Sequence, residues 1–413
     1  MDTKINVKNN ILWSSAGSFI YMLTQWLLSV FIVRISGFDD AGTYSLAMSI
    51  ANVFYGIAIY GMRNYQVSDI SGKYENRQYI DSRFVTCLVA IIGCLIFTVI
   101  NRYDLKTIIV ICLYMIFKAH EALVDVFHGI DQKKWSMDII GKSFIIRGLL
   151  NCTAFVVSLY IWKKLEVSIL LMVVISYLVI GLYDVPKAGK IDEIWTGRNK
   201  KKVEELLKEC FPIVVYVFMS TAITSIPRYI LELYYGSSIL GIYSSVSMPA
   251  TVVQVMATYV FSPIMSLFAL ELSNRSKNRF SKLLFKCLGA ITIIALLSLG
   301  GAKVLGKWAL CLIFGKEIEP YAYMLIPVII CSILTALVWF SCSILTVLRD
   351  FKGLLISNAC SLIGCIVLSI YYIKKYSMDG VNIVLILTLA LQILLCAGFI
   401  GNKIKNYNER EEQ

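Results

Sequence analysis

The sequence has 413 residues, a mean hydropathy of +0.72, 58% hydrophobic residues and only 16% charged residues. A soluble domain carries about 25% charged residues, so this composition excludes an ordinary soluble enzyme and indicates a polytopic membrane protein. The net charge of +12 is typical of basic cytoplasmic loops in such a protein, and we do not expect nucleic acid as a partner.

Apolar stretches recur along the chain, each long enough to cross a bilayer as a helix of about 20 residues. We predict twelve membrane spans, at 11–33, 41–62, 83–100, 105–129, 142–162, 166–186, 210–235, 238–264, 283–302, 321–347, 353–373 and 380–401. The first span follows no small-residue cleavage site, so we interpret it as a retained helix and not as a signal peptide. The predicted fold class is therefore all-α integral membrane.

The distribution of Lys and Arg predicts the orientation. With the N-terminus placed inside, 26 of the 39 basic residues fall in inner segments and 10 in outer segments, with Arg83 counted as an inner residue. Because basic residues favour the cytoplasmic side of a membrane, we expect both termini in the cytoplasm.

The largest polar linker, 187–209, divides the spans into two sets of six. We therefore expect an N-terminal six-helix lobe at 1–186, a cytoplasmic linker at 187–209 and a C-terminal six-helix lobe at 210–413. An even number of spans gives both lobes the same orientation, which predicts a pseudo-two-fold axis along the membrane normal.

The two halves also resemble each other as repeats. The segment GFDDAGTYS begins at Gly37 and the segment GSSILGIYS begins at Gly236, so their matching residues share an offset of 199. The register shifts later, because the second half carries roughly twenty extra residues around 303–321.

Ionisable residues lie inside the span at 105–129. Lys118, Glu121, Asp125 and His128 follow one another at steps of three or four, which places them on one face of a helix. Each such group costs about 2.5–3.5 kcal/mol near the bilayer centre, so we interpret the stripe as the wall of a hydrophilic cavity. The alternative is structural: Lys118 and Glu121 form an ion pair, and the other two reach the interface.

Two arginines lie within other spans. Arg147 is about one turn into its span, where it lines a cavity or extends to the interface. Arg228 lies deep in its span and has Glu232 four residues further on, so it lines a cavity or pairs with Glu232. With Arg34 near a span end, these cations favour an anionic head group, because the guanidinium fork suits phosphate.

Several catalytic patterns are missing from the sequence. It contains no Walker A motif, no HExxH motif and no Cys/His cluster with metal-ligand spacing, and its twelve cysteines are scattered through apolar spans. We therefore expect a protein that is not an enzyme and that holds no cofactor and no metal.

Three short motifs carry a family resemblance: Arg34-Ile35-Ser36-Gly37 followed by Gly42-Thr43-Tyr44, Gly61-Met62-Arg63, and Leu312-Ile313-Phe314-Gly315-Lys316-Glu317 followed by Tyr321-Ala322. Together with the twelve spans in two halves, they resemble the polysaccharide-specific transporters, which are flippases for O-antigen and capsule oligosaccharides. These transporters belong to the superfamily that also holds MATE exporters and lipid II flippases.

The resemblance implies two lobes around a central cationic cavity in the cytoplasmic (inner) membrane. It implies that the chain flips an undecaprenyl-pyrophosphate-linked oligosaccharide repeat unit by alternating access, for O-antigen, capsule or exopolysaccharide synthesis. The candidate contacts to pyrophosphate and acidic sugars are Arg34, Lys118, Arg147 and Arg228. Membrane lipids and a polysaccharide polymerase complex are the expected partners.

The acidic and imidazole groups of the stripe leave further hypotheses about function open. From their spacing, Glu121, Asp125 and His128 are candidates for binding a coupling proton or sodium ion. Glu121 and Asp125 also suit a MATE-like cation-coupled exporter of drugs or metabolites. A third alternative is a non-transporting membrane scaffold within a glycan assembly complex.

Overall fold

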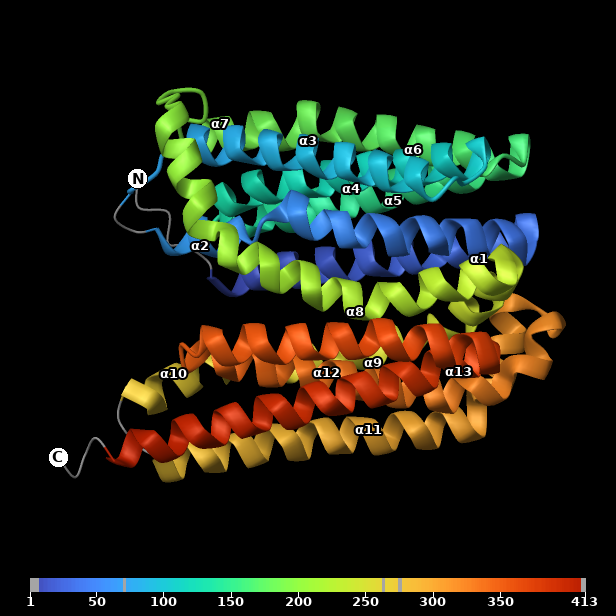
Figure 1. The fold of residues 1–413 in the computed structure, drawn as a ribbon. Coiled ribbons are helices and arrows are strands. Elements are labelled where there is room, and N and C mark those ends of the chain that lie inside the picture. Colours follow the sequence, from blue (N-terminus) through green and yellow to red (C-terminus); the bar gives the residue numbers. More distant parts are fainter. Residues whose placement is uncertain (1–6, 70–71, 262–263, 274–276, 410–413) are drawn as a thin grey trace. The chain divides into compact units, whose positions relative to one another are not determined.

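The computed structural model describes residues 7–69, 72–261, 264–273 and 277–409, and within these residues every regular element is a helix (Figure 1). Nine of the described helices are long and apolar enough to cross a membrane. Three of the nine contain a non-helical residue, which is Gly37, Gly236 or Ser377. The helices with Gly37 and Ser377 each correspond to two predicted spans, whereas the helix with Gly236 ends at Ser247 and holds the span at 210–235 and only the start of the span at 238–264. The predicted helical membrane architecture is confirmed.

The chain forms two compact units, Met1–Thr221 and Ala222–Gln413. The division falls within a long helix, α8, so the first part of this helix belongs to the first unit. The lobe limits inferred from the polar linker stay a prediction.

The first unit is built around α4. Its elements are α1 (Val7–Ile59), α2 (Met62–Ser68), α3 (Asn76–Ile100), α4 (Leu105–Lys133), α5 (Met137–Trp162), α6 (Leu165–Val179), the π-helix η1 (Ile180–Asp184), α7 (Val185–Ile191) and the start of α8 (Lys200–Ser247). Helix α4 packs against α1, α2, α3, α5 and α6. This central position gives the polar stripe of α4 protein neighbours in place of lipid, which lowers the cost of its charges.

The second unit contains the rest of α8 with α9 (Thr251–Phe261), α10 (Met265–Ser273), α11 (Lys277–Phe314), the 3-10 helix η3 (Lys316–Met324), α12 (Leu325–Val347) and α13 (Phe351–Glu409). Here α12 packs against α13, α9 and α11. In the span containing α12, 61% of the apolar stretch that could cross the membrane is buried within the protein, the same share as in α4. The fourth span of each half therefore has the corresponding central position within its own unit.

The backbone at the first helix break shows the internal repeat directly. Gly37 has φ 86° and ψ −176°, and Gly236 has φ 79° and ψ 172°. Only glycine adopts these angles without strain. The sequence match at an offset of 199 is thus a match of conformation.

Two later turns repeat with a larger offset. Trp135 and Arg349, which end the fourth and tenth spans, have φ 59° and 52°, and Lys163 and Ser377 have φ 49° and 51°. Both pairs lie 214 positions apart, so the offset has grown by 15 from 199. The position of the predicted insertion at 303–321 is confirmed, because α11 is longer than α3 and is followed by η3. The length of the insertion is 15 residues and not the roughly twenty that were expected.

Two glycines let α1 and α5 approach to backbone contact. A Cβ atom on Gly17 would lie 2.2 Å from the carbonyl oxygen of Gly141, and one on Gly141 would lie 2.1 Å from the carbonyl oxygen of Trp13. Small residues allow such close helix packing in membranes. The contact brings Tyr21, one turn after Gly17, next to Phe144, and these two residues help to line the site described below.

Candidate functional site

A cavity of about 230 Å³ lies inside the first unit. It is lined by Tyr21 and Tyr55 of α1, Arg63 of α2, Glu121, Val124, Asp125 and His128 of α4, and Phe144 and Arg147 of α5. The polar face predicted for the 105–129 helix therefore faces a cavity. Which ligand these residues bind stays a prediction.

Arg147 is the cationic group of this cavity with an unused donor. Its side chain is 1% exposed, its Nε donates to Ser143 Oγ at 3.2 Å, and its guanidinium lies 5.4 Å from the ring of Tyr21 and 5.2 Å from that of Phe144. Its Nη2 is buried and has no hydrogen-bond partner among the described residues. An unsatisfied buried donor is rare and costly in a native protein, so this atom is available to a bound anion.

Lys118 and Glu121 form the ion pair that the sequence left open as an alternative. Lys118 Nζ lies 2.7 Å from Glu121 Oε2, and Tyr21 donates from its hydroxyl to Glu121 Oε1 at 2.5 Å. The ammonium also lies 5.1 Å from the centre of the Tyr55 ring. Lys118 is not among the cavity-lining residues; it neutralises the carboxylate that does line the cavity.

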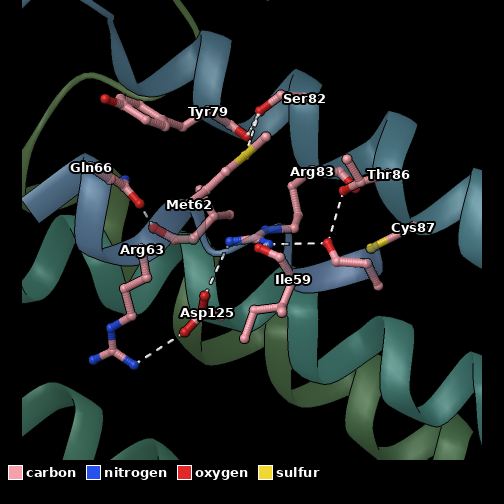
Figure 2. A network of polar contacts seen from close by, with 12 residues as sticks. Ile59, Met62, Arg63, Gln66, Tyr79, Ser82, Arg83, Thr86, Cys87 and Asp125 are labelled. Atoms are coloured by element: carbon pink, nitrogen blue, oxygen red, sulfur yellow. Dashed lines mark hydrogen bonds and ion pairs between the residues drawn. The ribbon is translucent and has the colours of Figure 1, made fainter. Parts of the chain in front are cut away.

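Asp125 is held by two arginines (Figure 2). Arg63 Nη1 lies 3.2 Å from Asp125 Oδ1 and Arg83 Nη2 lies 3.1 Å from Oδ2. Arg83 is fully buried, so its assignment to an inner loop is wrong. The hydropathy pattern placed the start of the span at residue 83, whereas α3 begins at Asn76, and this puts Arg83 on the buried face of the second turn.

Arg83 also caps the end of α1. Its Nη1 donates to the carbonyl oxygen of Ala58 at 3.1 Å and to that of Ile59, while Thr86 donates from its hydroxyl to Ala58 at 2.8 Å. The last carbonyls of a helix lack partners within the helix and attract cations. Ser82, Arg83 and Thr86 form a polar face at the start of an apolar helix, a signal from which this role could have been predicted.

His128 connects the cavity with a carboxylate that the sequence did not single out. Its side chain is 1% exposed, its ring lies 5.1 Å from that of Phe144, and its Nε2 lies 3.6 Å from Asp184 Oδ1. Asp184 was not identified from the sequence, because it falls at the end of an apolar stretch, where a carboxylate is typical of the membrane interface.

Two predicted contacts lie elsewhere. Arg34 is exposed on α1, close to the break at Gly37, and is not a lining residue. Arg228 lies on the part of α8 that belongs to the second unit. The structure brings together Lys118, Glu121, Asp125, His128 and Arg147, and substrate contacts by Arg34 and Arg228 stay predictions.

The electrostatics of the cavity favour an anion. Lys118 neutralises Glu121, and Arg63 and Arg83 together more than neutralise Asp125. Arg147 takes part in no ion pair within the described part of the chain. The lining therefore combines satisfied carboxylates with an uncompensated guanidinium in a setting of low dielectric constant, where its field is strong.

Comparison with solved structures identifies the class of fold. The lipid II flippase MurJ in an inward closed conformation has a TM-score of 0.75 at 13% identity, covering 96% of this chain and 90% of that chain. The MATE multidrug transporter DinF-BH has a TM-score of 0.71 at 13% identity, covering 97% of this chain and 96% of that chain. The chain therefore has the fold of helical membrane transporters, and the predicted fold class is confirmed.

The family follows from the sequence comparison. The model of the polysaccharide biosynthesis protein family matches residues 7–269, and the chain belongs to this family. The capsular polysaccharide biosynthesis protein CapF of Staphylococcus aureus is 26% identical over 313 residues, which make up 75% of this chain and 77% of CapF. The resemblance inferred from the three motifs is confirmed, and the matched region contains every residue that lines the cavity.

Proposed function

We propose that the protein flips a lipid-linked oligosaccharide repeat unit, carried on undecaprenyl pyrophosphate, across the cytoplasmic membrane. The family membership, the similarity to CapF and the fold shared with a lipid II flippase support a role in capsule, O-antigen or exopolysaccharide synthesis. The observation that carries the proposal is the buried guanidinium of Arg147, which lines the cavity and has a donor free for a ligand.

A diphosphate fits this arrangement chemically. Phosphate oxygens accept charge-assisted hydrogen bonds that are about twice as strong as neutral ones, and the planar guanidinium donates two of them in parallel. A diphosphate would also satisfy the buried Nη2 of Arg147. Arg63 is the second cation that lines the cavity and the next candidate contact to the diphosphate. Its Nη1 donates a hydrogen bond to Asp125 at 3.2 Å.

The size of the cavity limits what enters it. At about 230 Å³ it is smaller than the roughly 300–1,000 Å³ of ordinary ligand pockets. It accommodates the charged diphosphate, while the lipid tail remains in the bilayer and the sugars require a wider opening. This is the behaviour expected of one state in an alternating-access cycle, in which Arg34 and Arg228 are further candidate contacts.

The orientation and partners complete the proposal. Both termini lie in the cytoplasm according to the distribution of basic residues, so the substrate enters from the side that carries the linker. A polysaccharide polymerase complex receives the product on the outer side. Glu121 and Asp125 already have cationic partners, which disfavours a cationic drug as the cargo.

Complementation tests the function. A host lacking the gene receives the wild type, Arg147→Ala or Lys142→Ala, and surface glycan and intracellular lipid-linked repeat units are quantified. Lys142 is a matched control, because it lies on the same helix as Arg147 and is half exposed beside Asp138. We expect Arg147→Ala to lose surface glycan and accumulate the lipid-linked intermediate at wild-type protein level, and Lys142→Ala to behave as wild type.

Three other outcomes would contradict the proposal. Normal glycan in Arg147→Ala would remove the role of the cavity. Loss of glycan on deletion without accumulation of the intermediate would favour a scaffold. Normal glycan on deletion, together with new sensitivity to cationic drugs, would favour a MATE-like exporter.

A further inference from the structure

A second buried polar group lies next to the cavity, beyond His128. It consists of His128 and Asp131 of α4 and Asp184 at the end of η1, with exposed fractions of 1%, 0% and 0%. The proposed substrate contacts make no use of Asp131 or Asp184. Two carboxyl groups and an imidazole removed from water require an explanation, because each is costly to bury without partners.

These three side chains lack the hydrogen bonds that burial demands. In the part of the chain that the structure describes, neither carboxyl oxygen of Asp131 or Asp184 has a hydrogen-bond partner, and nor has Nε2 of His128. The nearest approach is that of His128 Nε2, which is aimed at Asp184 Oδ1 from 3.6 Å. An ionised carboxylate in such a site costs several kcal/mol, so the group lowers its energy by taking up a proton.

The surrounding charges do not relieve this cost. The titratable groups that interact with these three side chains are Arg63 of α2, His120 of α4, Asp138 and Arg147 of α5, and Tyr183 of η1. Tyr21 of α1 and Asp125 of α4 line the cavity beside His128, and Lys187 of α7 lies 5.9 Å from the ring of Tyr183. Arg63 is bonded to Asp125, and Asp138 is bonded to Lys142 at 2.8 Å. Asp131 therefore faces further carboxylates and no cation bonded to it, which favours its protonated form.

The backbone that carries Asp184 is unusual. Residues Ile180–Asp184 form a π-helix between α6 and α7. Such single π turns are rare and occur frequently at functional sites. Here the π turn ends on the residue to which His128 points, so an irregular backbone coincides with a buried carboxyl group that lacks a hydrogen-bond partner among the described residues.

We propose that His128, Asp131 and Asp184 form a proton-binding site that is coupled to the anion cavity through His128. The coupling rests on the proposed function; the proton site itself does not. Because His128 lines the cavity on one side and faces Asp184 on the other, a proton bound here makes the cavity wall more positive. Proton and diphosphate therefore bind cooperatively, and by linkage the binding of each promotes that of the other.

This proposed site differs from the set of ion-binding residues that was expected from the sequence. Glu121 accepts from Lys118 and Tyr21, and Asp125 accepts from Arg63 and Arg83. Neither has the unsatisfied oxygens found in Asp131 and Asp184. The proton site therefore retains His128, while Asp131 and Asp184 take the place of Glu121 and Asp125.

Infrared difference spectroscopy tests the site without any substrate. The full chain is placed in lipid nanodiscs and the carbonyl stretch of protonated carboxyl groups is followed during a pH titration. We expect a titrating band in the wild type that is lost in Asp131→Asn or Asp184→Asn and is unchanged in Glu204→Gln, whose exposed carboxylate is paired with Lys208 at 2.7 Å. Identical bands in the wild type and in both buried variants, each with a wild-type elution profile, would overturn the proposal.

Calorimetry tests the coupling. Farnesyl diphosphate is titrated into the full chain in two buffers with different ionisation enthalpies, which reports the number of protons taken up. We expect the dissociation constant of the wild type to fall by up to about tenfold per unit of decreasing pH, the limit for one linked proton, and this uptake to be lost in His128→Gln.

The two possible failures are distinguishable. The titration of the diphosphate itself contributes equally to the wild type and the variant, so proton uptake that is unchanged in His128→Gln would overturn the coupling. A wild type that binds no farnesyl diphosphate at any pH would contradict the proposed function, while the infrared band would still decide whether the proton site exists.

Discussion

The fully buried guanidinium of Arg83 on α3 donates a hydrogen bond to the carboxylate of Asp125 on α4 at 3.1 Å. The same guanidinium bonds to the last carbonyls of α1, so one side chain joins three helices (Figure 2). Arg63 completes the neutralisation of Asp125. The charge of the Asp125 carboxylate is thereby neutralised within the protein, so the positive charge of Arg147 remains uncompensated in the cavity.

Replacing Arg83 should destabilise the first unit. Arg83→Met leaves Asp125 with one partner and the end of α1 without its cap, and removing one member of a buried ion pair costs about 3–5 kcal/mol. Chemical unfolding in detergent measures the loss. Arg198→Ala is the control, since this side chain is 70% exposed and lies 3.6 Å from Asp81; its effect should stay within about 0.5 kcal/mol.

A double variant tests whether the two residues act as a pair. Arg83→Met combined with Asp125→Asn should cost less than the sum of the single changes, by about 0.5–3 kcal/mol, because neither charge is then left unpaired. Strict additivity in this cycle would show that the interaction seen in the structure contributes nothing to stability.

The glycine contact between α1 and α5 should tolerate no added methyl group. In Gly17→Ala the new Cβ would lie 2.2 Å from a backbone oxygen, so the helices must separate, at a cost of about 1–3 kcal/mol. Gly289→Ala on α11 is the comparison, because a Cβ atom at this position would meet nothing within 4 Å; this variant should be neutral or stabilise by about 0.4–1 kcal/mol. Equal thermal stability of the two variants would contradict the close packing.

The cap of α4 should give a small pH dependence. The carboxylate of Asp104 accepts from the backbone N–H of Thr107 at 3.1 Å. The pKa of Asp104 is lowered below its usual value, chiefly by hydrogen bonding to the Thr107 side chain and in addition by this backbone N–H. A lowered pKa contributes stability above the unfolded value, which is about 3.9, and the contribution disappears as the pH falls through the folded value.

Asp104→Ala should therefore cost about 0.5–1 kcal/mol at neutral pH, the lower part of the range for N-caps, because the residue is exposed. The difference from wild type should shrink in strong acid, as measured by unfolding across a pH series. Asp104→Asn keeps a capping oxygen and should remove the pH dependence. A gap between wild type and Asp104→Ala that stays constant down to strongly acidic pH would exclude this role for the carboxylate.

The parts of the site that follow from helix geometry could be predicted from the sequence. Glu121, Asp125 and His128 share a face because their spacing is local to α4, and that face lines the cavity. Gly37 and Gly236 could be matched because a backbone that only glycine adopts leaves a residue-level signal.

The partners of these residues could not be predicted in the same way. Tyr21, Arg83 and Asp184 come from three other elements, and only the packing of those elements brings them to Glu121, Asp125 and His128. Hydropathy also assigned Arg83 and Asp184 to the ends of their spans, where charge is ordinary. The structure shows both side chains fully buried, so Arg83, which was counted with an inner segment, is a core residue, and so is Asp184.

Flipping by the purified chain tests the central claim most directly. Proteoliposomes are loaded with a dye-labelled short-chain prenyl diphosphate sugar, and a reductant that does not cross the membrane bleaches the molecules that reach the outer leaflet. At low probe concentration, we expect Arg147→Ala to flip about 10–100-fold more slowly than the wild type, because a hydrogen bond to a charged group contributes about 1.5–3 kcal/mol. Lys142→Ala should flip at the wild-type rate. Equal rates in wild type and Arg147→Ala would contradict the claim that the cavity of the first unit binds the diphosphate.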